Sequence, residues 1–176
     1  MAKTNADRMF LNSDEEHALE VLVQLIQLSK EKIQIFAGSL CEHIGNKPEY
    51  IVALSEFIER GGILNILLNR YDEEKAKNSN LYKRLAYYKA NGKQIIVKST
   101  KGKPYLSNDA DKKEVHFTVG DRKSYRLETD IENRTAECNF NNPEIAGMIA
   151  NFFDKLFADS GSEEINIEKI FDDGNK

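Results

Sequence analysis

The sequence predicts an α/β fold in which a mixed, largely parallel β-sheet is flanked by helices. One observation is the order strand, helix, strand, helix, strand between residues 33 and 98. This order is typical of parallel strands joined by right-handed crossovers. The other is the segment 114–119, whose apolar residues occupy every second position, as in a half-buried strand. Turn residues at 120–123 lead from it into a second strand, 124–130.

The first crossover units lie in the N-terminal third of the chain. Ser13 is a suitable N-cap for a helix whose apolar positions continue to Leu28. A strand is expected at 33–38. Pro48 suits the first turn of a second helix, and the glycine pair 61–62 ends it.

The middle of the chain continues the same pattern. Residues 63–68 are nearly all apolar, which is typical of a central parallel strand covered on both faces. A helix at 81–90 and a strand at 94–98 follow. The lysine-rich segment 99–113 is predicted to be a long loop, which is either a solvated insertion or a rim facing phosphate.

The C-terminal part begins with the hairpin 114–130 and continues with a strand at 135–140. Asn142 suits the N-cap of a last helix, and Pro143 suits its first position. An apolar stripe that includes three phenylalanines follows on this helix. Such a stripe indicates core packing or a dimer contact.

The length of 176 residues favours a single domain. We expect a flexible arm at 1–12, one domain at 13–158 and an acidic C-terminal tail at 159–176. The tail is either a docking segment or a frayed end. Cys41 and Cys138 have the spacing of neither a zinc site nor a disulfide framework, so they are predicted to be buried free thiols.

Composition narrows the class of protein. The N-terminus lacks an apolar signal segment and the chain lacks an apolar run of about 20 residues, so we expect a cytoplasmic protein without membrane contact. The net charge of −4 argues against a protein built wholly around nucleic acid, although it leaves room for a local basic groove.

One short segment carries a resemblance to a known family. Glu114, His116 and Asp121 have the spacing of the motif H-x-K-x4-D. Together with the order of the elements and the closing strand and helix at 139–157, this spacing resembles the phospholipase D superfamily. The likeness covers roughly residues 15–160 and implies a phospholipase D-like fold.

The resemblance also shows departures from the superfamily. There, one histidine attacks phosphorus to form a phosphohistidine, a second protonates the leaving group, and lysines hold the phosphate oxygens. In the first register, Glu114 stands at the histidine and His116 at the lysine. In the second, His116 is the histidine, but Thr118 replaces the lysine and Lys123 the aspartate. Residues 126–130 stand where the G-S-x-N segment is expected. The resemblance therefore implies that the classical chemistry is lost.

A rebuilt site remains an alternative. If the hairpin register is suitable, His116, Arg126 and Glu128 converge on one face. A histidine beside a glutamate is a candidate general base, and arginine suits bidentate binding of phosphate or carboxylate. The competing interpretation is a structural polar cluster, in which Arg126 pairs with Glu128 or Glu114.

Basic residues are numerous around this region, and Lys101 and Lys103 are candidate phosphate ligands. A basic cleft would favour nucleic-acid or phosphodiester chemistry; its expected members are Lys98, Lys101, Lys103, Lys112, Lys113, Arg122, Lys123 and Arg126. His, Cys and Asp do not cluster at ligand spacing, so neither a metal nor another cofactor is expected.

Two functions follow as hypotheses. The first is a non-catalytic phospholipase D-like module that acts as a bacterial interaction or regulatory protein with a protein partner. The alternative is a metal-independent phosphodiesterase or nuclease, or a binder of phosphate ligands or nucleic acid, with a remodelled site around His116. Superfamily members with one motif per chain build their site across a homodimer. The resemblance therefore implies a homodimer with the hairpins 116–130 near its two-fold axis.

Overall fold

The structure, a computed structural model, describes residues 9–12, 14–102, 114–133 and 135–172. Two of its elements, η2 and η3, are short 3-10 helices. In chain order the elements are β1 (Phe10–Asn12), α1 (Glu15–Leu28), β2 (Lys32–Ala37), η2 (His43–Asn46), α2 (Pro48–Glu59), β3 (Ile63–Leu68), α3 (Glu73–Lys77), α4 (Asn80–Ala90), β4 (Ile95–Thr100), β5 (His116–Gly120), β6 (Ser124–Asp130), β7 (Thr135–Asn139), α5 (Pro143–Ala158), β8 (Ser162–Glu164) and η3 (Lys169–Phe171).

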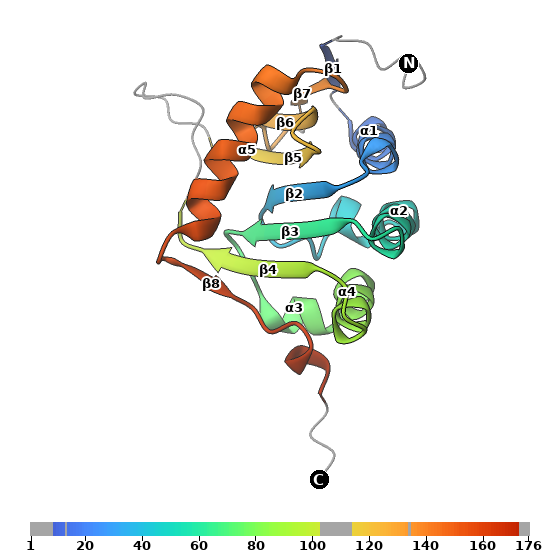
Figure 1. The fold of residues 1–176 in the computed structure, drawn as a ribbon, viewed down its shortest axis with the longest axis vertical. Helices are drawn as coiled ribbons and strands as arrows, with labels where there is room; N and C mark the ends of the chain where they lie inside the picture. Colours follow the sequence, from blue (N-terminus) through green and yellow to red (C-terminus); the bar gives the residue numbers. More distant parts are fainter. Residues whose placement is uncertain (1–8, 13, 103–113, 134, 173–176) are drawn as a thin grey trace.

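The strands form one mixed sheet in the order β1-β7-β6-β5-β2-β3-β4-β8. Helices α1, α2 and α4 lie on one side of it and α5 on the other (Figure 1). The predicted mixed sheet flanked by helices is confirmed. It is less parallel than expected, because only β2, β3 and β4 pair in parallel and the other described pairings are antiparallel. Short turns connect β5, β6 and β7, and turns of this length join only antiparallel neighbours.

Alternation along β2 separates the two cores of the molecule. Ile33 and Ile35 pack with apolar residues of α1, α2 and α4, whereas Phe36 belongs to a cluster that contains Phe153 of α5. On this second face the Gln34 side chain donates a hydrogen bond to Asp154 at 2.7 Å. The buried faces of β2 therefore fix which side of the neighbouring hairpin meets the helices.

The turn of the β5–β6 hairpin is anchored by Asp121. Its carboxylate accepts hydrogen bonds from the backbone N–H groups of Lys30, Glu31 and Lys32 at 2.7, 2.8 and 2.9 Å. Asp121 has a φ of 52°, a left-handed conformation that aspartate tolerates. The motif aspartate thus holds the connection between α1 and β2 against the hairpin.

Most predicted elements lie where the periodicity placed them. The strands 63–68 and 124–130 agree with the structure, and Pro143 occupies the first turn of α5 after the N-cap Asn142. The N-cap of α1 is Asp14 and not the predicted Ser13, which lies outside the described residues. The Asp14 side chain accepts a hydrogen bond from the backbone N–H of His17. Both cysteines are buried and free, as predicted.

The two terminal segments are more structured than expected. Of the arm predicted at 1–12, Phe10–Asn12 pairs with β7, and residues 1–8 lie outside the described part. In the C-terminal tail, β8 pairs with the free edge of β4, and Ile167 is fully buried against the α4 side of the sheet. An unpaired strand edge presents free N–H and C=O groups, and β8 satisfies those of β4. The described helices include none long and apolar enough to span a bilayer.

Candidate functional site

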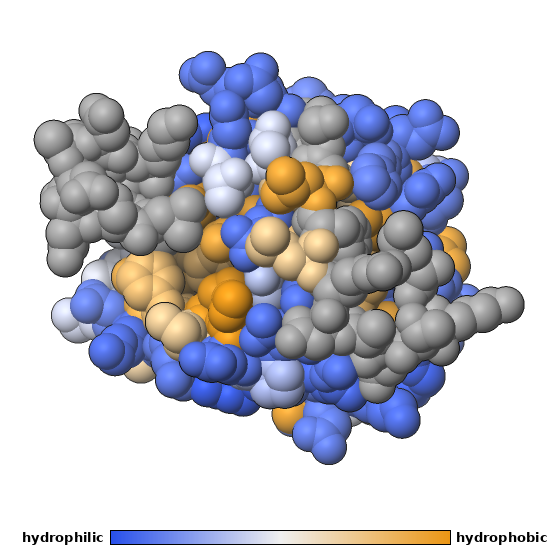
Figure 2. Space-filling view, turned by 90° about the horizontal axis from the view of Figure 1, so that it is seen from above, coloured by the Kyte–Doolittle hydropathy of each residue, from blue (hydrophilic) through white to orange (hydrophobic). Residues whose placement is uncertain are grey.

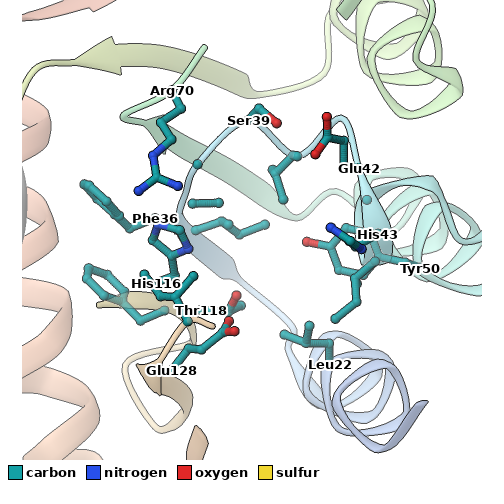
Figure 3. A pocket seen from close by; sticks show the side chains of 18 of the residues that line it. Leu22, Phe36, Ser39, Glu42, His43, Tyr50, Arg70, His116, Thr118 and Glu128 are labelled. Carbon is teal, nitrogen blue, oxygen red and sulfur yellow. The ribbon is translucent and has the colours of Figure 1, made fainter. Parts of the chain in front are cut away.

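A cavity of about 440 Å³ lies at the carboxyl ends of β2 and β3. One wall comes from β5 and β6, and the opposite wall from α1, η2 and α2 (Figure 3). Gly38 and Ser39 follow β2 and Arg70 follows β3, and all three line the cavity. Open α/β sheets commonly bind ligands at this end of their strands.

The hairpin register determines the polar wall. His116 lies opposite Glu128, and Thr118 lies opposite Arg126, so these four side chains occupy one face of the two strands. Thr118 also pairs with Ile35 of β2, which faces the helices α1 and α2. The three predicted site residues, His116, Arg126 and Glu128, therefore all line the same cavity.

His116 contacts Glu114 rather than Glu128. Its Nε2 lies 3.3 Å from Oε1 of Glu114, and both side chains are about 15% exposed. Glu114 also accepts a hydrogen bond from the Asn69 amide and forms an ion pair with Arg70 at 3.2 Å. Glu114 is thus the centre of a small polar network beside the cavity, and two members of this network, Arg70 and His116, line the cavity.

Arg126 and Glu128 form a second ion pair, 3.1 Å between Nη1 and Oε2. Their side chains are 5% and 14% exposed, so the pair is largely shielded from solvent. The sequence left a convergent site and a structural polar cluster open. The observed pairing of Arg126 with Glu128 is one of the two that the structural-cluster interpretation names.

Burial sets the protonation of the two motif positions. Burial lowers the pKa of His116, although the carboxylates of Glu128 and Glu114 oppose the shift. Burial alone would raise the pKa of Glu114, but the Asn69 hydrogen bond and the charges of Arg70 and His116 outweigh it and lower that pKa. At neutral pH the pair is therefore a neutral imidazole beside a carboxylate.

The described members of the expected basic cleft do not share one surface. Lys98 donates a hydrogen bond to the carbonyl of Phe157 at 2.8 Å, on the α5 side of the sheet. Arg122 forms an ion pair with Asp154 of α5 at 3.3 Å, whereas Arg126 faces the cavity on the other side. Lys101 is exposed and does not line the cavity. The remaining loop members, Lys103, Lys112 and Lys113, lie outside the described residues.

Several site residues were not predicted from the sequence. Asn69 and Arg70 follow β3 directly, and the rule that ligands bind at the carboxyl ends of parallel strands would have pointed to them. Tyr50 of α2 is 1% exposed and lines the cavity, and no local sequence signal marks it. Across residues 9–12, 14–102, 114–133 and 135–172, no three His, Cys, Asp or Glu side chains are placed to hold a metal ion.

Comparison with solved structures identifies the architecture. Nuc from Salmonella typhimurium, a phospholipase D family member, matches with a TM-score of 0.60 and 15% identity over 91% of this chain and 99% of its own. The chain has the phospholipase D fold. NucT from Helicobacter pylori matches as well as Nuc does, with a TM-score of 0.60 and 15% identity over 91% of this chain and 100% of NucT.

A third similar structure is TrmBL2, an archaeal chromatin protein. Its TM-score is 0.63 at 14% identity, over 93% of this phospholipase D-like chain and 56% of TrmBL2. The present chain thus corresponds to about half of TrmBL2. No protein-family model matches the sequence, and no curated protein matches it.

Proposed function

We propose that the protein is a non-catalytic phospholipase D-like module that acts as an interaction or regulatory protein in the bacterial cytoplasm. The observation that carries this proposal is Glu114 at the position of the motif histidine. Its carboxylate is bonded to Asn69, Arg70 and His116, which leaves a fixed negative charge where a nucleophile would attack phosphorus.

The fixed charge is unfavourable for a phosphodiester. Two like unit charges about 4 Å apart repel by about 4 kcal/mol at the effective dielectric constant of a protein surface. Arg70 offsets part of this repulsion because its ion-pair partner is Glu114 itself, whereas Arg126 and Lys75 are already paired with Glu128 and Glu42. The cavity therefore lacks the excess of positive charge that phosphate binding requires.

The comparisons are compatible with a role outside catalysis. TrmBL2 is described as an archaeal chromatin protein with a novel mode of DNA binding, so the fold occurs in a DNA-binding chromatin protein. For the present chain, the net charge of −4 and the dispersed positions of Lys98, Arg122 and Arg126 favour a protein partner over nucleic acid.

A remodelled phosphodiesterase is the second candidate, and one observation favours it. His116 is neutral, faces the cavity and has its Nε2 3.3 Å from a carboxylate oxygen of Glu114. This is the arrangement of a general base oriented by an acid. In that reaction His116 would activate water, and Arg126 would hold a phosphate oxygen.

Hydrolysis of bis-p-nitrophenyl phosphate and single-stranded DNA, with and without EDTA, separates the two candidates. The proposal expects no turnover above a blank for the wild type, for His116→Ala and for the control His17→Ala, whose site is on α1 outside the cavity. EDTA-resistant turnover that His116→Ala abolishes and His17→Ala keeps would overturn the proposal and establish the remodelled enzyme. Circular dichroism of each variant verifies folding.

We further propose a homodimer with the hairpins 116–130 near its two-fold axis. Apolar residues gather in the middle of the face seen from the β1 end of the molecule (Figure 2). On α5, Met148 is 66% exposed and Phe152 is 39% exposed, whereas Phe153 is buried in the core. Sedimentation velocity is expected to give a dimer, and Phe152→Ser is expected to weaken it. A monomeric wild type at all accessible concentrations would refute this assembly.

A further inference from the structure

The cavity has two chemically different walls. Thr118, Arg126 and Glu128 form the polar wall on β5 and β6. Leu22 of α1 and Tyr50 of α2 lie across the space from Glu128, which is turned towards them (Figure 3). A ligand that fills this space has a polar part and an apolar part.

The charges of the lining are balanced. Arg70, Lys75 and Arg126 are matched by Glu42, Asp72 and Glu128, and Arg70 also forms an ion pair with Glu114, which does not line the cavity. A cavity of this kind does not favour a ligand with a large net charge of either sign. It suits a ligand that carries one positive and one negative group, because each group meets its complement without leaving a buried charge unpaired.

We propose that the cavity binds a free α-amino acid with an apolar side chain, and that this ligand regulates the module. The inference rests on the proposed non-catalytic function and names the chemistry of its regulator. The volume of about 440 Å³ falls within the range of about 300–1,000 Å³ that is usual for small-molecule sites.

Each part of an amino acid has a partner in the cavity. An ionised carboxylate offers about four acceptor positions, so Glu128 can accept an ammonium group while Oε2 keeps its bond to Arg126. Arg70, whose side chain is 60% exposed, bonds Glu114 through Nη2 and has further N–H donors of its planar guanidinium for the ligand carboxylate. The apolar side chain then lies against Leu22 and Tyr50.

The loop after β2, which also lines the cavity, is held in a fixed shape. Leu40 and His43 have φ values of 57° and 54°, left-handed conformations that are costly for these residues and concentrate at ligand sites. The Asn46 side chain donates to the carbonyl of Cys41 at 2.7 Å, and the Tyr82 hydroxyl donates to the carbonyl of Ser39 at 2.7 Å. This part of the cavity lining is therefore preorganised, which reduces the entropy cost of binding.

Calorimetric titration and thermal shift with L-leucine, L-methionine and L-phenylalanine test the proposal on the full chain. At least one of these probes is expected to bind and to raise the melting temperature. The two one-charge analogues of leucine, 3-methylbutylamine and 4-methylpentanoate, are expected to bind at least about 10-fold more weakly, because each lacks one of the two charge-assisted contacts that the amino acid makes.

Variants locate the site. Glu128→Gln keeps an oxygen for Arg126 but removes the charge that meets the ammonium group, so the dissociation constant is expected to rise about 10- to 100-fold. The matched control Glu56→Gln removes an exposed carboxylate of α2 outside the cavity and is expected to leave affinity unchanged. Ile44→Phe adds bulk to the half-buried cavity wall and is expected to abolish binding without unfolding the chain.

The outcomes separate this inference from the proposed function. No binding of any of the three amino acids, equal binding of the one-charge analogues, or unchanged affinity in Glu128→Gln overturns the inference, even when phosphodiester hydrolysis is absent. His116-dependent hydrolysis overturns the proposed function instead, whatever the binding data show. Competition of bis-p-nitrophenyl phosphate with a bound amino acid would assign the cavity to phosphodiesters and overturn the inference.

Discussion

Removing the carboxylate of Asp121 is expected to destabilise the fold without changing any property of the cavity. Asp121 has the spacing of the aspartate in the motif H-x-K-x4-D, and its oxygens accept hydrogen bonds from the N–H groups of Lys30, Glu31 and Lys32. It does not line the cavity. The substitutions Asp121→Ala and Asp121→Asn therefore test whether this residue holds the α1–β2 connection against the hairpin.

The magnitude follows from the number of bonds lost. Each of the three hydrogen bonds is worth about 0.5–1.5 kcal/mol, so Asp121→Ala loses about 2–4 kcal/mol. The left-handed φ of 52° adds about 1 kcal/mol for alanine. Asparagine tolerates this φ, and its oxygen can keep the two bonds that Oδ1 accepts, so Asp121→Asn loses about 1 kcal/mol.

Urea and thermal unfolding followed by circular dichroism provide the assay. At about 2–4 °C per kcal/mol for a chain of this size, Asp121→Ala is expected to lower the melting temperature by roughly 10 °C and Asp121→Asn by about 3 °C. The control Glu132→Gln, an exposed residue of the turn after β6, is expected to shift it by less than about 2 °C. Equal losses in the Asn and Ala variants, or no loss in either, would refute the reasoning.

Two further predictions concern protonation and the C-terminal segment. Burial lowers the pKa of His116, so on acidification the unfolded state takes up the imidazole proton at a higher pH than the folded state does. The free energy of unfolding is therefore expected to fall as the pH drops below about 6.5 towards the folded pKa. His116→Gln is expected to make the free energy of unfolding less dependent on pH in that range. A pH dependence identical to that of the wild type would contradict this prediction. Ile167→Ala is expected to lower the free energy of unfolding by about 2–5 kcal/mol because Ile167 is fully buried. The control Val52→Ala, at an exposed residue, should lower it by less than about 1 kcal/mol. Equal urea midpoints for the two variants would show that the C-terminal segment around Ile167 does not support the core.

Periodicity was sufficient to predict the elements that have clear patterns. The apolar run of β3 and the alternation along β5 give the type and position of both strands from local sequence alone. β8 escaped prediction because its residues are mostly charged. It is a strand only because the free edge of β4 offers hydrogen-bonding partners. The same limit applies to β1, which pairs with β7.

The candidate site also has features that the local sequence predicted and features that depend on distant residues. The alternation of β6 put Arg126 and Glu128 on one face of that strand, but only the register in the structure places His116 on the same side of the hairpin. The partner of His116 was not predictable, because Glu114 is held by Asn69, which lies 45 residues away in sequence. Tyr50 and Leu22 reach the cavity from helices whose packing on the sheet decides their direction.

By itself, the sequence determined the order and type of the main elements, the absence of an intact H-x-K-x4-D motif, and the alternation of polar and apolar side chains along each strand of the hairpin. These follow from side-chain chemistry and from the periods of strand and helix, which are local properties. Only the tertiary structure decided that Asp121 is an anchor, that Arg126 pairs with Glu128, and that the cavity is charge-balanced. Each of these depends on groups that pack together from distant parts of the chain.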